Sequence, residues 1–236
     1  MEIIIIEGKS GSGKSYSLRN LNPKSGVILS PNTKPLSFKG GNAFKVEVVP
    51  ELADLAKRIT YFAEKGARWI IVEDFTHTQN NRLLGESFRA AGTSKQNMYA
   101  RWEQFAADVY QSVFDLSSKI TAKTKVIVMS HTMEDGNGQS VYKLYGKMLG
   151  NVVDPVSYCR IVLHSVVTDA KEPKDRYRFL TNMNHQYEAK SPYGMFPGDL
   201  IENDLNAVFK MIDAYDKGEE TPAPKPAAEP VAQATE

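Results

Sequence analysis

Eight residues near the start of the chain, GKSGSGKS from Gly8 to Ser15, have the pattern G-x-x-x-x-G-K-S of a phosphate-binding loop, or P-loop. Glycines allow the backbone to turn its N–H groups inward, and such a ring of amides binds anions. The lysine is suited to the β- and γ-phosphates, and the serine hydroxyl to Mg²⁺. The residues expected to bind ATP with Mg²⁺ are Gly8, Lys9, Ser10, Gly11, Ser12, Gly13, Lys14, Ser15 and Tyr16.

An acidic pair, Glu73 and Asp74, follows the apolar segment WIIV. Open α/β sheets bind ligands at the carboxyl ends of their strands, where this pair is expected to lie. We expect Asp74 to hold Mg²⁺ with Ser15, usually through a water molecule. Glu73 either activates the attacking water or points away from the nucleotide, because neighbouring residues of a strand face opposite sides of a sheet.

A second polar pair, Ser130 and His131, ends the apolar segment KVIVM. Because adjacent parallel strands end side by side, His131 is predicted to sense the γ-phosphate. A histidine that caps or packs the structure is the alternative.

Apolar segments alternate with helical patterns along the chain, which predicts an α/β fold. A mainly parallel central sheet is expected, flanked by helices, with antiparallel strands toward the C-terminus. The predicted strands are residues 2–6, 26–30, 43–49, 68–74, 125–131, 159–167 and 176–182. The predicted helices are a short one at SYSLRN and longer ones at 50–66, 98–120 and 203–218, whereas 76–97 and 132–151 are read as polar, flexible stretches.

Composition is that of an ordinary globular protein, with 42% hydrophobic residues and a formal net charge of +1 over 236 residues. Cys159 is the only cysteine, so an intrachain disulfide and a cysteine-based zinc site are excluded. The apolar runs are too short for a signal peptide or a membrane helix, so we expect a cytoplasmic protein without a membrane partner. Residues 218–236 are rich in proline and alanine and are predicted to form a disordered acidic tail after a domain of residues 1–217.

These motifs together resemble the phage RecA-like nucleotide-binding proteins, a family of small P-loop ATPases associated with single-strand annealing and recombination. The resemblance covers most of residues 1–205. It rests on the P-loop with its short helix, on VEDFT, on the strand ending in SH, on YKLYGKMLGNVVDPVSYCRIVLHS (142–165) and on YEAKSPYGMFPGDLIENDL (187–205).

The resemblance implies a RecA-like ATPase domain that binds single-stranded DNA, forms a homo-oligomer and acts with an annealing or single-strand binding protein. Gly8, Gly13, Lys14 and Ser15 match its phosphate loop, Asp74 its metal aspartate and His131 its polar sensor. Lys190 resembles the basic residue that reaches the γ-phosphate of a neighbouring subunit. The alternative for Lys190 is a solvated surface lysine.

One departure from the family concerns catalysis. RecA-like ATPases usually carry a glutamate just after the second strand, but here that strand is followed by Pro31, Asn32, Thr33 and Lys34. Either Glu73 replaces that glutamate, or hydrolysis is slow and the nucleotide acts mainly as a conformational ligand. A nucleotide-gated adaptor without catalysis is therefore one alternative. A small-molecule kinase is another, although the sequence has no cluster of arginines in a lid-like insertion, which a kinase needs.

Two segments are candidates for the DNA contact, because each combines aromatic and basic residues. Residues 76–104 contain Arg82, Arg89, Lys95, Arg101 and Trp102, and residues 132–151 contain Tyr142, Lys143, Tyr145 and Lys147. The acidic residues of both segments dilute this charge, and Trp102 lies on a helical pattern typical of a core residue.

Overall fold

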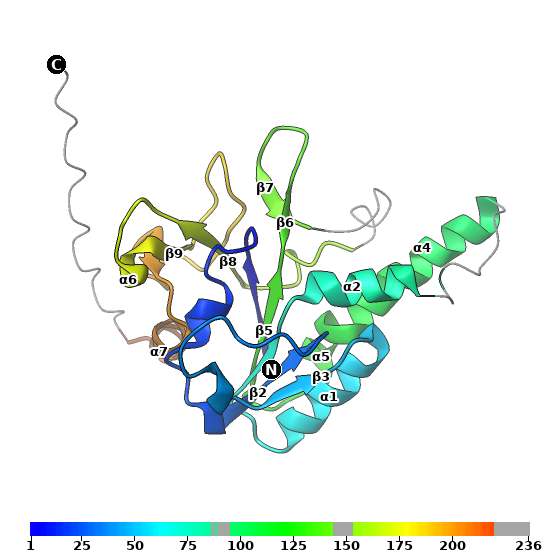
Figure 1. Cartoon of the computed structure of the whole chain (residues 1–236), viewed down its shortest axis with the longest axis horizontal. Helices are drawn as coiled ribbons and strands as arrows, with labels where there is room; N and C mark the ends of the chain where they lie inside the picture. Colours follow the sequence, from blue (N-terminus) through cyan, green and yellow to red (C-terminus); the bar gives the residue numbers. More distant parts are fainter. Residues whose placement is uncertain (86–87, 89–94, 144–152, 220–236) are drawn as a thin grey trace.

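A computed structural model of the chain describes residues 1–85, 88, 95–143 and 153–219. Helices lie on both faces of a central, mostly parallel sheet, which makes this an α/β fold (Figure 1). Within these residues the sheet has eight strands, in the order β10-β9-β8-β1-β5-β4-β2-β3. Their bounds are β1 Glu2–Glu7, β2 Gly26–Ser30, β3 Val46–Val48, β4 Trp69–Val72, β5 Lys125–Ser130, β8 Ile161–Val167, β9 Tyr177–Leu180 and β10 Leu200–Glu202.

The register of the parallel strands aligns their carboxyl ends. Glu7 of β1 lies beside Ser130 of β5, and Val72 of β4 lies beside Val128 of β5. The loops that follow β1, β4 and β5 therefore leave the same edge of the sheet, with β5 in the middle. Strand β8 extends the parallel pairing on the other side of β1, and β9 is antiparallel to both β8 and β10.

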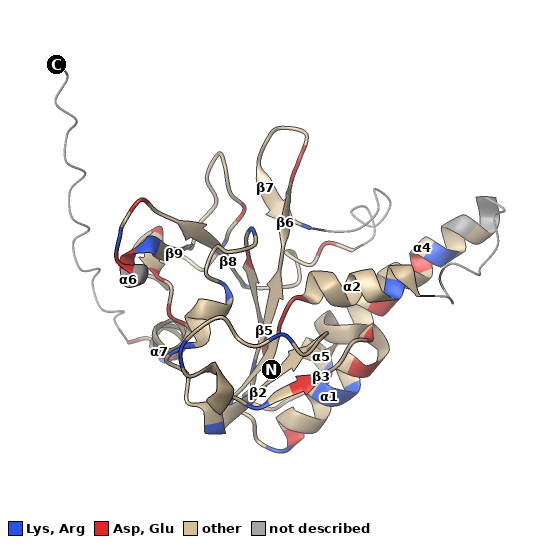
Figure 2. Ribbon diagram, in the orientation of Figure 1, with Lys and Arg blue, Asp and Glu red and all other residues tan. Residues whose placement is uncertain are grey.

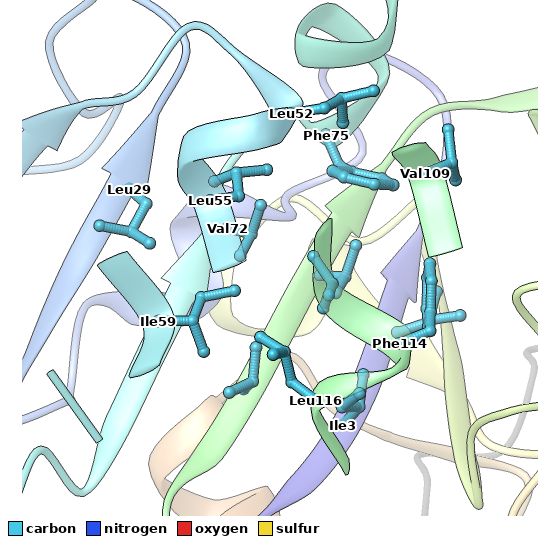
Figure 3. Packing of buried hydrophobic residues seen from close by; sticks show 14 of the residues in the cluster. Ile3, Leu29, Leu52, Leu55, Ile59, Val72, Phe75, Val109, Phe114 and Leu116 are labelled. Carbon is cyan, nitrogen blue, oxygen red and sulfur yellow. The ribbon is translucent and has the colours of Figure 1, made fainter. Parts of the chain in front are cut away.

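The isoleucine run of β1 divides between two hydrophobic cores, because successive side chains of a strand point to opposite faces. Ile3 and Ile5 belong to one cluster, which helix α1 (Leu52–Glu64) covers with side chains such as Leu55 and Ile59 (Figure 3). Ile4 and Ile6 belong to the other cluster, which α7 (Leu205–Asp216) covers. Burial on both faces explains the uninterrupted apolar sequence of this strand.

Of the remaining described helices, α2 (Phe75–Leu84) and α4 (Lys95–Val109) are the longer ones, and the others are single turns. The other α-helices are α5 (Leu116–Lys119) and α6 (Pro173–Arg176), with a π-helical turn η4 (Tyr110–Phe114) between α4 and α5. The 3₁₀ helices are η1 (Ser15–Leu18), η2 (Pro23–Ser25) and η3 (Gly41–Ala43). None of the helices in the described ranges is long and apolar enough to cross a membrane.

The structure differs from the sequence predictions in two polar segments. The stretch predicted as polar from residue 76 begins as helix α2, because Asp74 caps its first turn by accepting a hydrogen bond from the N–H of His77 (3.2 Å). The stretch after His131 begins with a hairpin of β6 (Thr132–Glu134) and β7 (Ser140–Tyr142), which projects from the sheet edge (Figure 1). Its turn is closed by Asp135, whose carboxylate accepts bonds from the N–H groups of Asn137 and Gln139 (both 2.8 Å).

Other differences concern element boundaries. The helix predicted at 98–120 is interrupted by η4, β3 is shorter than the predicted 43–49, and β10 was not anticipated. The antiparallel pairing expected toward the C-terminus is confirmed, because β8 and β9, predicted as strands 159–167 and 176–182, pair in this way. The predicted tail lies outside the described residues from position 220 onward.

Candidate functional site

A cavity of about 300 Å³ lies at the carboxyl edge of the parallel strands. The P-loop forms its floor, the ends of β4 and β5 form one wall, and the segment after β2 forms another. The predicted site residues that line it are Ser10, Gly11, Gly13, Lys14, Ser15, Tyr16, Glu73, Asp74 and His131. Side chains separated by more than a hundred residues in the sequence therefore meet in one hollow.

The P-loop backbone uses the conformational freedom of its glycines. Gly11 and Gly13 have φ angles of 78° and 99°, a region that residues with a Cβ rarely adopt. Within the described part of the chain, the N–H groups of Gly13, Lys14 and Ser15 have no hydrogen-bond acceptor. Unpaired amides at the start of η1 provide donors for an anion.

Lys14 folds back onto the loop that carries it. Its Nζ atom donates to the carbonyl oxygens of Gly8 (2.6 Å) and Lys9 (3.0 Å). Burial lowers the pKa of Lys14 to about 8, although the nearby carboxylates of Asp74, Glu7 and Glu73 favour its charged form. The ammonium is thus held at the loop and partly stripped of water, so that a phosphate would be a strong partner.

Ser15 and Glu73 are joined directly. The Ser15 hydroxyl donates to Oε1 of Glu73 at 2.8 Å. Burial raises the pKa of Glu73, while the bond from Ser15 acts in the opposite direction. Sequence reasoning paired Ser15 with Asp74, whereas this hydroxyl is hydrogen-bonded to Glu73.

Asp74 turns toward His131 instead. It has a φ angle of 48°, the only positive φ among the described residues other than glycine, and its Oδ1 lies 3.5 Å from Nε2 of His131. Burial and the positive charge of Lys14 lower the pKa of His131, although Asp74 raises it. Ser130 points away from the cavity, since its hydroxyl lies 2.8 Å from that of buried Thr76.

A buried polar pair underlies the P-loop, and sequence reasoning did not single it out. Nδ1 of His164 lies 2.9 Å from Oε1 of Glu7, and both side chains are almost fully buried. Burial raises the pKa of Glu7 well above its usual value and lowers that of His164 to about 4. The sequence did offer a signal for this pair, because Glu7 and His164 are polar residues within otherwise apolar strands.

Sequence reasoning missed Tyr177 on β9 and Ser37 after β2, which line the cavity although no motif connects them to the P-loop. Asn32 and Lys34 also line it, at the position after the second strand where the family's glutamate was expected. Only the folded sheet brings β9 to this edge.

Lys190 is not brought to the cavity of its own chain. Its backbone pairs with Val162 near the start of β8 (2.8 and 2.9 Å), and it does not line the cavity. Its predicted contact with a neighbouring subunit stays a prediction. Of the two candidate DNA segments, Arg89, Tyr145 and Lys147 lie outside the described residues, whereas Arg82 forms an ion pair with Asp108 (2.8 Å).

The donor set fits magnesium held jointly with a nucleotide. The cavity offers the Ser15 hydroxyl and the carboxylates of Glu73 and Asp74, and Mg²⁺ prefers oxygen ligands and keeps several waters and phosphate oxygens in its shell. No group of three or more His, Cys, Asp or Glu side chains that could hold a metal by itself occurs within residues 1–85, 88, 95–143 and 153–219. The protein would thus supply part of the coordination shell.

Comparison with known proteins adds no family assignment. Neither a protein-family model nor a curated protein matches the chain.

Proposed function

We propose that the chain binds ATP with Mg²⁺ in this cavity and hydrolyses it slowly, as a RecA-like P-loop protein acting on single-stranded DNA. The observation that carries the nucleotide part is the meeting of the unpaired P-loop amides, Lys14 and the Ser15–Glu73 pair in one cavity. Each of these groups has a separate task toward a triphosphate.

The phosphates are bound by the loop and by Lys14. The ammonium leaves the carbonyl oxygens of Gly8 and Lys9 and moves to the β- and γ-phosphates, whose negative charge stabilises its protonated form. The free amides of Gly13, Lys14 and Ser15 complete the anion site.

Magnesium would be held by Ser15 together with the acidic pair. It neutralises charge on the phosphates when bound. Because Ser15 already touches Glu73, we assign the nearer metal contact to Glu73. Asp74, next to His131, is then placed to orient water or to sense the γ-phosphate, a division that exchanges the roles expected from the sequence.

Slow turnover follows from what surrounds the site. The segment after β2 contributes Asn32 and Lys34 to the cavity and no carboxylate. Among the described residues, the carboxylates that line the cavity are Glu73, which is bonded to Ser15, and Asp74, which lies beside His131. Each therefore already has a partner, which weakens it as a general base. A nucleotide-gated adaptor is therefore the second candidate function.

The DNA part of the proposal rests on the resemblance. The β6–β7 hairpin carries the acidic residues Glu134 and Asp135, and Figure 2 shows both signs of charge scattered over the fold. The charge of the described surface thus adds no independent support for a DNA site.

The experiment is phosphate release from ATP, measured with and without single-stranded DNA at a stated salt concentration. The proposal expects a low basal rate that single-stranded DNA increases, with Lys14→Ala inactive under both conditions. Saturable ATP binding without turnover would favour the adaptor. Phosphorylation of a small acceptor would establish a kinase, and turnover that Lys14→Ala leaves unchanged would refute the assigned site.

A further inference from the structure

Two tyrosine rings form part of the cavity wall on the side away from the acidic pair. Tyr16 belongs to η1 and Tyr177 to β9, and both line the cavity. Their ring centroids are 5.4 Å apart and their planes are inclined at 49°. Both side chains are half-buried, so part of each ring remains open to a ligand. We call this pair the tyrosine wall.

The tyrosine wall is fixed to the P-loop. The ring of Tyr177 packs against Gly13 so closely that a Cβ on Gly13 would lie 2.7 Å from the ring. The guanidinium of Arg19 lies 4.3 Å from the centroid of the Tyr16 ring. Arg19 itself donates to the Glu202 carboxylate at 3.0 Å and to the carbonyl oxygen of Asn203. Rings held in this way would lose little freedom on binding a ligand.

Sheet order fixes which end of a triphosphate meets the tyrosine wall. Glu73, Asp74 and His131 follow β4 and β5, on one side of the P-loop strand β1. Tyr177 lies on β9, which is separated from β1 by β8 on the opposite side. When the terminal phosphate faces the acidic pair, the nucleoside end extends toward β8 and β9.

We propose that the tyrosine wall is the base-binding part of the site and selects purine nucleotides, an inference that rests on the proposed function. Aromatic faces bind nucleobases by stacking, and every base offers such a face. The larger area of a purine gains more from this contact than a pyrimidine does. The alternative is that Tyr177 only packs the P-loop, in which case its loss affects phosphate binding itself.

The test compares ATP, UTP and inorganic triphosphate, each with Mg²⁺, by calorimetric titration of the full chain. Tyr177→Leu removes the aromatic face, Tyr177→Phe keeps it, and Tyr193→Leu is the control because Tyr193 is fully exposed and outside the cavity. We expect Tyr177→Leu to lower the affinity for ATP about tenfold or more, while the affinity for triphosphate stays within twofold. Tyr177→Phe and the control should bind ATP as the unsubstituted chain does.

Other outcomes decide the alternatives. The inference is overturned if Tyr177→Leu lowers the affinities for ATP and for triphosphate equally, or lowers neither. Should this variant fail to fold, the unsubstituted chain still decides, because equal affinity for ATP, UTP and triphosphate would show that no base site exists. That last result would leave the proposed triphosphate site intact. Absence of binding for all three ligands would instead overturn the proposed function, and the inference with it.

Discussion

At the scale of single residues, the two acidic side chains after β4 have different partners. Glu73 accepts from the Ser15 hydroxyl at 2.8 Å, whereas Asp74 lies 3.5 Å from His131 and caps α2. Neighbours at a strand end face different directions, so one acidic pair can serve both the metal and the terminal phosphate. This division leads to a direct comparison of two isosteric variants.

Glu73→Gln should raise the Mg²⁺ concentration needed for half-maximal ATP binding about tenfold, and by more than Asp74→Asn does. The reason is that removing the charge next to Ser15 weakens the metal contact itself. The measurement is an Mg²⁺ titration at fixed ATP, with binding in excess EDTA as the metal-free control. If Asp74→Asn raises the required Mg²⁺ concentration more than Glu73→Gln does, the nearer metal contact belongs to Asp74.

Lys14 makes nucleotide binding dependent on pH. Burial lowers its pKa to about 8 in the free protein, and only the protonated form attracts phosphate. ATP affinity should therefore be constant below pH 7 and fall about tenfold between pH 7 and pH 9. Proton uptake on binding near pH 8, measured by calorimetry in two buffers, checks the same point. A pH-independent affinity over this range, or an equal slope in Lys14→Ala, would contradict the assignment.

At the scale of elements, the short η1 depends on α7 for its position. Asp204 caps α7 by accepting from the N–H groups of Asn206 (2.8 Å) and Ala207 (3.4 Å), and it also accepts from the side chain of Asn20 just after η1 (2.6 Å). One carboxylate thus joins the segment just after η1 to the start of α7.

Asp204→Ala should lower the free energy of unfolding by about 1 to 2 kcal/mol, the usual cost of a lost helix cap. The measurement is denaturant unfolding, with Asp204→Asn retaining most of the cap and the exposed Asp169→Ala as a control. An unchanged stability of Asp204→Ala would show that the cap contributes little.

The elements that sequence predicted well are those whose pattern reflects burial. The apolar runs of β1, β4 and β5 are buried on both faces, and their carboxyl ends place the P-loop, Glu73 and His131 at one edge. The hairpin and α2 were missed because their sequences are polar, and local bonds of Asp135 and Asp74 determine them. Tyr177 was missed for another reason, since only the pairing of β9 with β8 brings it to the cavity.

At the scale of the whole molecule, the resemblance to RecA-like proteins implies that one subunit completes the site of the next. The backbone of Lys190 pairs with β8, and Lys190 does not line the cavity of its own chain. A phosphate that Lys190 contacts would therefore belong to a nucleotide bound by a second chain. ATPase activity per chain should rise with protein concentration. Lys190→Ala should lower that activity at high concentration without changing ATP affinity, in contrast to the exposed control Lys171→Ala. Activity independent of concentration would argue against a shared site.

The central claim is that the P-loop cavity binds a nucleoside triphosphate through Lys14. Titration of MgATP into the full-length chain at pH 7 tests this claim most directly, with Lys14→Ala as the comparison and circular dichroism as the check on folding. The account predicts one saturable site per chain that the folded Lys14→Ala variant loses. No saturable binding to the unsubstituted chain, or equal binding to the variant, would contradict it.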